Sequence, residues 1–295
     1  MDELLVPFQY EFMARAIWMS ALVGTMCAFL SCYLMLKGWS LMGDALAHAI
    51  VPGVAIAYVM GAPYAVGAFF AGLLASGGMA VIREQTRLKD DAVIGLVFTT
   101  FFAAGLLIAS LYPTSVSVQT IIHGNILAIS DWDAMQVTVI AVVTIAILAV
   151  LWKDLAAVFF DENHTRSIGL NPRALKILFF ALLSAATVAA LQTVGALLVI
   201  AMVITPGATA YLLADRFGRL ILIACAIGGV TGAVGAYVSY FLDGATGGVI
   251  VLLQTALFLA AFFFAPKHGL FGQHRRARSS AVVEHPETGR AVIRP

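Results

Sequence analysis

Asp44 and His48 are the two residues whose types and spacing best suit chemistry in this sequence. They are four positions apart, so on a helix both side chains project from one face and can reach a single ion. A carboxylate and an imidazole together suit divalent metals such as manganese, zinc and iron. Two structural alternatives stay open on spacing alone: Asp44 follows Gly43 at the expected start of a helix and could cap it, and His48 could hydrogen-bond to a neighbouring helix. Two ligands do not complete a metal site, so the rest must come from another helix, a second copy of the chain, or water.

The segment that carries this pair lies in a chain that is built to cross a membrane. Hydrophobic residues make up 61% of its 295 residues and charged residues only 11%, against about 25% charged residues in soluble proteins. Seven stretches without Asp, Glu, Lys or Arg together cover 201 residues. Because a membrane-crossing helix needs about 20 apolar residues, these stretches predict an all-α polytopic membrane protein with about eight transmembrane helices. The crossings are expected near residues 14–36, 41–60, 63–82, 92–111, 133–152, 174–194, 219–241 and 246–266.

The few basic residues set the expected orientation. They gather in the connections near 83–89, 153–176 and 216–219 and in the tail after residue 266, whereas the connection at 112–130 has none. Positive residues mark cytoplasmic loops, so the basic connections and the C-terminus are expected in the cytoplasm and 112–130 outside. With one short returning helix in the count, the N-terminus is expected outside.

That returning helix is the segment Gly195–Thr205, which is too short to cross the membrane. Eleven residues reach about 16 Å, roughly half the hydrocarbon core, so we predict a short or re-entrant helix that ends at Pro206 and Gly207. A separate short helix, Ala208–Leu213, is expected to follow at the cytoplasmic surface. Residues 1–266 are then expected to form the transmembrane domain, and the polar, basic residues 267–295 a disordered cytoplasmic tail.

The residues also argue against several classes of function. Cys27, Cys32 and Cys225 lie in apolar stretches without CxxC spacing, which argues against a thiolate metal site. The sequence has no GxxxxGK[ST] loop, so the chain is not expected to bind ATP by that route. A basic tail on a nearly charge-free body indicates orientation in a membrane and not nucleic-acid binding. An ion-coupled secondary transporter or an intramembrane enzyme remains the alternative, although such proteins usually place several ionisable residues in the membrane.

A resemblance to a known family rests on three motifs. The run at 38–53, GWSLMGDALAHAIVPG, resembles the hallmark of the ABC-3 family of zinc, manganese and iron importer permeases, and the metal-interacting Asp and His proposed for that family correspond to Asp44 and His48. Residues 193–213 resemble the family's segment that leads into the ATPase-contacting loop, and are more distantly similar to vitamin B12 and siderophore permeases. Residues 160–170 resemble its acidic cytoplasmic segment, although His164 departs from the pattern and is expected as a solvated loop residue. The resemblance implies an ATPase-coupling loop formed by Pro206, Gly207, Ala208, Thr209, Tyr211 and Leu212.

The same resemblance implies a function and a set of partners. The chain is expected to be a permease subunit in a bacterial cytoplasmic (inner) membrane and not an enzyme, because partner ATPase subunits in the cytoplasm would hydrolyse the ATP. An extracytoplasmic binding protein would deliver the metal, a second permease subunit, identical or paralogous, would pair with the chain, and no cofactor would be bound permanently. The strings TPGATAYLL and HGNIL resemble the manganese and iron branch of the family more than its zinc branch. Manganese is the expected ion, with zinc or iron as alternatives. His123, Asp131 and Asp133 could form a funnel for incoming cations, or simply a solvated loop.

Overall fold

The helices of the chain confirm the predicted class. A computed structural model describes residues 2–39, 41–112 and 129–265, and within these ranges the only regular elements are helices. Eight of the described segments are long and apolar enough to cross a membrane. They are α2 (Glu11–Lys37), the pair α3 (Met42–Ala49) and α4 (Val51–Val59), α5 (Tyr64–Gln85), α6 (Asp90–Leu111), α8 (Asp131–Phe160), α10 (Pro172–Val194), α12 (Phe217–Leu242) and α13 (Thr246–Phe264). The predicted tail, 267–295, lies outside the described residues.

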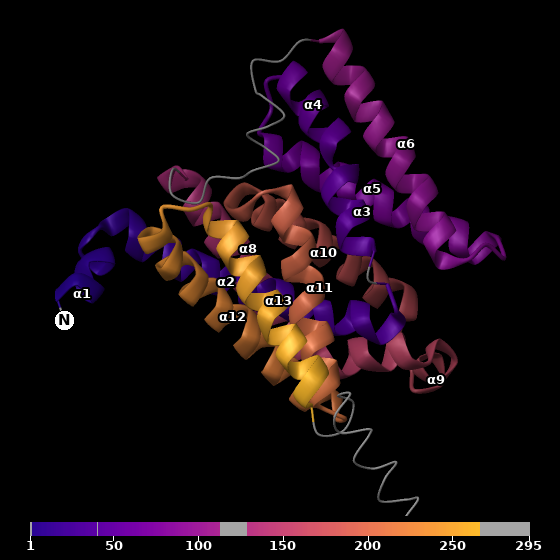
Figure 1. Ribbon diagram of the computed structural model, residues 1–295. Helices are drawn as coiled ribbons and strands as arrows, with labels where there is room; N and C mark the ends of the chain where they lie inside the picture. Colours follow the sequence, from indigo (N-terminus) through magenta and orange to yellow (C-terminus); the bar gives the residue numbers. More distant parts are fainter. Residues whose placement is uncertain (1, 40, 113–128, 266–295) are drawn as a thin grey trace, which may run out of the picture.

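The crossing helices form two groups, which Figure 1 shows side by side. One group contains α3, α4, α5 and α6. The other contains α2, α8, α10, α11 (Ala196–Leu213), α12 and α13. The helix α2 is central to the larger group, because it contacts α8, α10, α11 and α12 and most of its length is buried. The short helix α3 contacts α5 and α6 on one side and α10 and α11 on the other. The helix that carries Asp44 and His48 therefore lies at the boundary between the two groups.

Small residues allow the closest approach between neighbouring helices. At the crossing of α2 and α12, a methyl group added to Gly24 or to Gly228 would overlap the backbone carbonyl of the other glycine. Helices in lipid gain stability mainly from such close packing, since lipid tails are as apolar as the helix surfaces.

The segment after residue 195 differs from the prediction. The helix α11 runs without interruption from Ala196 to Leu213, so Pro206 and Gly207 lie inside it and no separate helix follows them. Its 18 residues span about 27 Å, close to the thickness of the hydrocarbon core and well beyond the 16 Å or so expected. The chain reverses between α10 and α11 at Gly195 alone, whose φ of 83° and ψ of 162° fall in a region essentially restricted to glycine.

Candidate metal site and coupling segment

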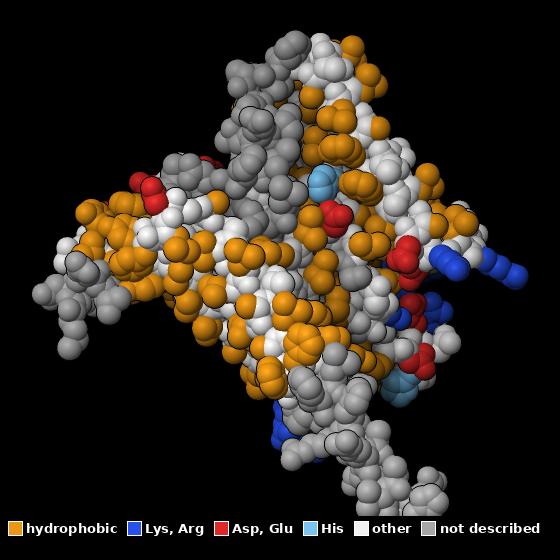
Figure 2. Space-filling view, viewed as in Figure 1, with side chains coloured by type: hydrophobic (Ala, Val, Ile, Leu, Met, Phe, Trp, Pro, Cys, Tyr) orange, Lys and Arg blue, Asp and Glu red, His pale blue; other side chains and the backbone are white. Residues whose placement is uncertain are grey.

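Asp44 and His48 lie on one face of α3 and contact each other. The Nδ1 atom of His48 is 3.1 Å from Asp44 Oδ1 and 3.1 Å from the Asp44 backbone oxygen. The N-cap of α3 is Leu41, so Asp44 lies inside the first turn and the capping alternative is wrong. The side chains of Asp44 and His48 are 36% and 25% exposed, which leaves them accessible to an ion. Figure 2 shows a histidine and an acidic side chain together among hydrophobic side chains over this part of the molecule.

The helix that carries the pair is interrupted just after it. Pro52 has no N–H to donate to the carbonyl of His48, four residues earlier, and its ring crowds that carbonyl. Accordingly α3 ends at Ala49 and α4 begins at Val51, with Ile50 between them. The predicted crossing at 41–60 is thus confirmed as a membrane-spanning segment, Met42–Val59, but one built of two short helices.

One stripe of α6 covers the pair and the interruption. The rings of Phe98 and Phe102 lie 5.4 and 5.6 Å from the His48 ring and almost perpendicular to it, at 84° and 81°. Farther along α6, Gly105 lets this helix approach the start of α4 closely, because a methyl group there would lie 2.9 Å from the backbone nitrogen of Pro52. The spacing of 98, 102 and 105 places these residues on one helix face. The stripe holds the imidazole from one side. Sequence reasoning missed it, although the i, i+4 spacing of the two phenylalanines was visible.

The pair does not form a complete metal site by itself. Within the ranges that the structure describes, no group of three or more His, Cys, Asp or Glu side chains is placed to hold a metal ion. Structural and catalytic metal sites commonly use at least three protein ligands. What the described residues provide is two donors on a partly exposed surface.

The predicted coupling segment forms the C-terminal half of α11, and Ser31 of α2 bonds to the backbone where the helix continues through Pro206. The Ser31 hydroxyl donates to the carbonyl of Ile204 at 3.1 Å and accepts from the N–H of Gly207 at 3.1 Å. It thereby bridges the backbone on both sides of the proline, as neighbouring helices do for prolines in membranes. Gly207 allows this contact, because a methyl group there would overlap Ser31 Oγ.

The six predicted coupling residues differ in accessibility. Tyr211 is exposed, and Ala208 and Leu212 are half-buried. The buried ones are Pro206, Gly207 and Thr209. A soluble partner would therefore reach the segment mainly through Tyr211 and Leu213, which are 56% and 44% exposed. Sequence reasoning did not identify Ser31, because the serine lies in a different predicted helix and carries no local signal.

Residues 9–265 match the sequence profile of the ABC 3 transport family. The chain belongs to this family. As an ABC 3 family member it is similar to the chelated iron transport system membrane protein YfeC of Yersinia pestis, with 67% identity over 94% of this chain and 95% of YfeC. It is 44% identical to the manganese transport system membrane protein MntB of Synechocystis, over 98% of this chain and 95% of MntB. The solved structure of PsaBC from Streptococcus pneumoniae in complex with Fab has a TM-score of 0.82 and 31% identity, over 94% of this chain and 99% of that chain.

In this ABC 3 family member, the two described residues of the predicted cation funnel have different partners. His123 lies outside the described residues. Asp131 pairs with Arg15 of α2, a partner that sequence reasoning missed. Asp133 lies in the first turn of α8, where the hydroxyl of Ser130 donates to its carboxylate at 2.6 Å and accepts from its N–H at 3.1 Å. Both carboxylates thus contact groups that anchor the start of α8, and the funnel stays a prediction.

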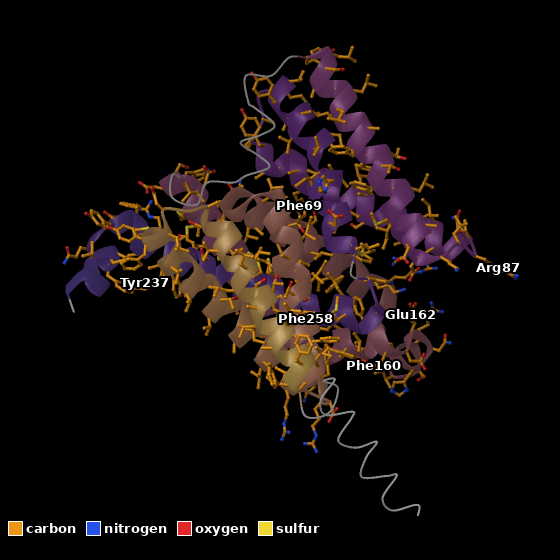
Figure 3. The ribbon with its side chains drawn as sticks, viewed as in Figure 1. Phe69, Arg87, Phe160, Glu162, Tyr237 and Phe258 are labelled. Atoms are coloured by element: carbon orange, nitrogen blue, oxygen red, sulfur yellow. The ribbon has the colours of Figure 1, made fainter. Side chains whose placement is uncertain are left out.

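The third motif of this ABC 3 chain forms a short helix in place of the expected loop. Asp161 caps α9 (Glu162–Ser167) by accepting from the N–H groups of Asn163 and His164. His164 is exposed, as expected for a solvated residue. The ion pair between Glu162 and Lys176, at 2.5 Å, ties α9 to α10. In Figure 3, Phe160, Glu162 and Arg87 lie toward one end of the molecule and Tyr237 toward the other.

Proposed function

We propose that the chain is the membrane-spanning permease subunit of an ATP-driven importer for a divalent transition metal ion. The observation that carries the proposal is the contact between Asp44 and His48, a carboxylate and an imidazole that are both accessible on a membrane-spanning segment of an ABC 3 family member. Ionisable groups at such positions are costly and commonly mark ion pathways. The names of the relatives, which describe iron and manganese transport systems, support the same choice of cargo.

The geometry of the pair suits one ion. Two metal–ligand bonds of about 2.2 Å at a right angle end about 3.1 Å apart, and Asp44 Oδ1 lies 3.1 Å from His48 Nδ1. The ion would take the place of the hydrogen bond between these atoms. The carboxylate would supply charge and the imidazole the borderline donor that favours transition metals over calcium or magnesium. Phe98 and Phe102 would limit rotation of the imidazole, so that Nδ1 stays directed at Asp44.

The missing ligands point to a second permease subunit. Because the described part of the chain contributes two donors, an ion of coordination number four or six needs others from water, from residues outside the described ranges or from another subunit. We infer that a second subunit, identical or paralogous, brings its own residues to the same ion. The ion would then pass between the two subunits.

The energy is proposed to come from separate ATPase subunits in the cytoplasm, so the chain itself is not an enzyme and holds no permanent cofactor. These subunits would dock at the C-terminal end of α11, where Tyr211 and Leu213 are exposed. A binding protein would deliver the metal on the outer face, and ATP binding and hydrolysis would drive alternating access. The basic connections would face the cytoplasm in a bacterial inner membrane, as would the C-terminus.

Manganese is the cargo that we propose first, with ferrous iron second. The string TPGATAYLL at 205–213 favours manganese or iron over zinc. The iron system name of the 67% identical relative supports iron, and the manganese system name of the 44% identical relative supports manganese. The Asp44 and His48 donors suit both ions.

Metal uptake by cells tests the proposal. Cells that lack their own metal importers would express the chain with its ATPase and binding protein, and uptake of labelled Mn²⁺, Fe²⁺ and Zn²⁺ would be measured. We expect uptake with the wild type, its loss with Asp44→Ala and His48→Ala, and no change with His164→Ala, which removes an exposed histidine of α9. Equal amounts of ATPase should copurify with every variant. Wild-type uptake rates in both pair variants would exclude the site, and absence of uptake of all three ions would exclude the function.

A further inference from the structure

Trp39 lies between α2 and α3 and contacts both groups of helices. Its side chain is buried, and its ring packs against Phe159 of α8 at 5.7 Å and against Phe180 of α10 at 6.0 Å between centroids. The guanidinium of Arg83, near the end of α5, lies over the same ring at 4.2 Å. The indole Nε1–H donates to the carboxylate of Asp90, the first residue of α6, at 2.9 Å. One side chain therefore joins α5 and α6 to α8 and α10.

Arg83 and Asp90 close this contact into a cluster of three. Arg83 Nε lies 3.0 Å from Asp90 Oδ1, and the Arg83 side chain is only 12% exposed. A guanidinium so far removed from water is costly unless a carboxylate or an aromatic face lies against it, and here both do. The Nε and Nη2 atoms of Arg83 have no hydrogen-bond partner among the described residues, so its stability depends on these two contacts. The carboxylate also lies at the N-terminus of α6, where the helix dipole favours negative charge. Removing the charge of Asp90 would leave Arg83 with the Trp39 ring and the weaker attraction of Asp91.

Both helices that shape the metal pair start from this cluster. The helix α3 begins at Met42, three residues after Trp39, and carries the pair. The helix α6 begins at Asp90 and reaches Phe98 after eight residues, or about 12 Å. Because a helix is stiff over that length, the position of Asp90 on Trp39 fixes where the Phe98 ring meets α3. A shift of α6 by one residue would move its side chains by 1.5 Å or so along the axis and rotate them by about 100°, away from His48.

We propose that Trp39, Arg83 and Asp90 form a positioning cluster that sets the register of α6 against α3 and thereby the orientation of His48 toward the transported metal. The inference rests on the proposed function, and none of the three residues is proposed to touch the ion. The cluster acts through Phe98 and Phe102, whose rings limit the imidazole. Loss of the cluster should therefore weaken the binding of metal more than it slows the later steps of transport.

Two conservative substitutions test the cluster, with a matched control. Asp90→Asn removes the charge that pairs with Arg83, and Trp39→Phe keeps an aromatic ring but removes the N–H. The control is Asp91→Asn, because Asp91 is the next residue of α6, is also acidic and is exposed. Binding of ⁵⁴Mn²⁺ to the purified permease and ATPase complex, without the binding protein, would be measured against Mn²⁺ concentration. Maximal uptake rates would be measured in cells that express the full importer, and normalised to the amount of assembled complex in the membrane.

We expect both cluster variants to raise the half-saturating Mn²⁺ concentration by about 2- to 30-fold, with the maximal rate per complex within about twofold of the wild type. Asp91→Asn should match the wild type. A half-saturating Mn²⁺ concentration that is unchanged in both cluster variants would overturn the inference. A fall in the maximal rate or in the amount of complex, without a change in the half-saturating concentration, would also overturn it. Trp39→Phe decides the matter if Asp90→Asn does not assemble. Absence of Mn²⁺ uptake by the wild type would refute the proposed function. Normal uptake by the wild type with no effect of the variants would refute only the positioning cluster.

Discussion

Replacing Ser31 with alanine should weaken the contact of α2 with α11 at Pro206. The hydroxyl makes two hydrogen bonds of 3.1 Å to the α11 backbone and is fully buried. Without it, the buried N–H of Gly207 loses its oxygen partner from α2, which costs about 1–3 kcal/mol when no replacement is available. Single hydrogen bonds between helices in membranes average about 0.6 kcal/mol and reach about 1.7 kcal/mol. For two bonds we expect a loss of about 1–2 kcal/mol in the free energy of unfolding.

Ser20→Ala is the matched control for this measurement. Ser20 lies on the same helix and is equally buried, but its hydroxyl has no hydrogen-bond partner among the described residues. Its removal should therefore be neutral or slightly stabilising. The free energy of unfolding would be measured by reversible denaturation in mixed micelles, and amide hydrogen exchange would report on Gly207. Equal stability of the two variants, together with unchanged exchange at Gly207, would refute the role of Ser31.

Two further substitutions test the coupling segment and the helix packing. Tyr211→Asp should leave the fold intact, because Tyr211 is 56% exposed, but should reduce copurification of the ATPase at least about tenfold, since a charge would replace an apolar contact. Ala210→Asp places the same charge at a buried position, so it should lower the yield of folded protein instead. Normal ATPase binding by folded Tyr211→Asp would count against docking at this end of α11. Gly53→Ala should cost about 1–3 kcal/mol in the free energy of unfolding, because the methyl group would overlap the backbone carbonyl of Gly67. Gly77→Ala, where the space is open, should be neutral or slightly stabilising, and equal melting temperatures of these two variants would contradict the close packing of α4 on α5.

The membrane-spanning segments could be predicted because the length of an apolar stretch is a local property of the sequence. The ends of the helices were less certain, since charged residues do not stop a helix at the membrane surface. The helix α8 continues through Lys153 and Asp154 to Phe160, eight residues beyond the predicted end. The i, i+4 spacing of Asp44 and His48 likewise predicted their contact, which needs only one helix to form.

The features that sequence reasoning missed depend on partners far away in the chain. Pro206 ends a helix by local rules, but α11 continues through it, with the hydroxyl of Ser31 from another helix bonded to the backbone on both sides of the proline. The pairing of Asp131 with Arg15 joins residues 116 positions apart, so an acidic residue that suggested a funnel is held by a cation. Phe98 and Phe102 can contact His48 only when α6 packs on α3. No single-residue pattern encodes these contacts.

The most direct test of the account concerns the nitrogen that binds the metal. Mn²⁺ would be added to the purified permease and ATPase complex, and pulsed electron paramagnetic resonance would detect imidazole nitrogen bound directly to the ion. We expect this nitrogen signal in the wild type and in His164→Ala, and its loss in His48→Ala together with weaker Mn²⁺ binding in Asp44→Ala. An unchanged nitrogen signal in His48→Ala, with wild-type Mn²⁺ affinity in Asp44→Ala, would contradict the assignment of these two residues as the metal ligands of the chain.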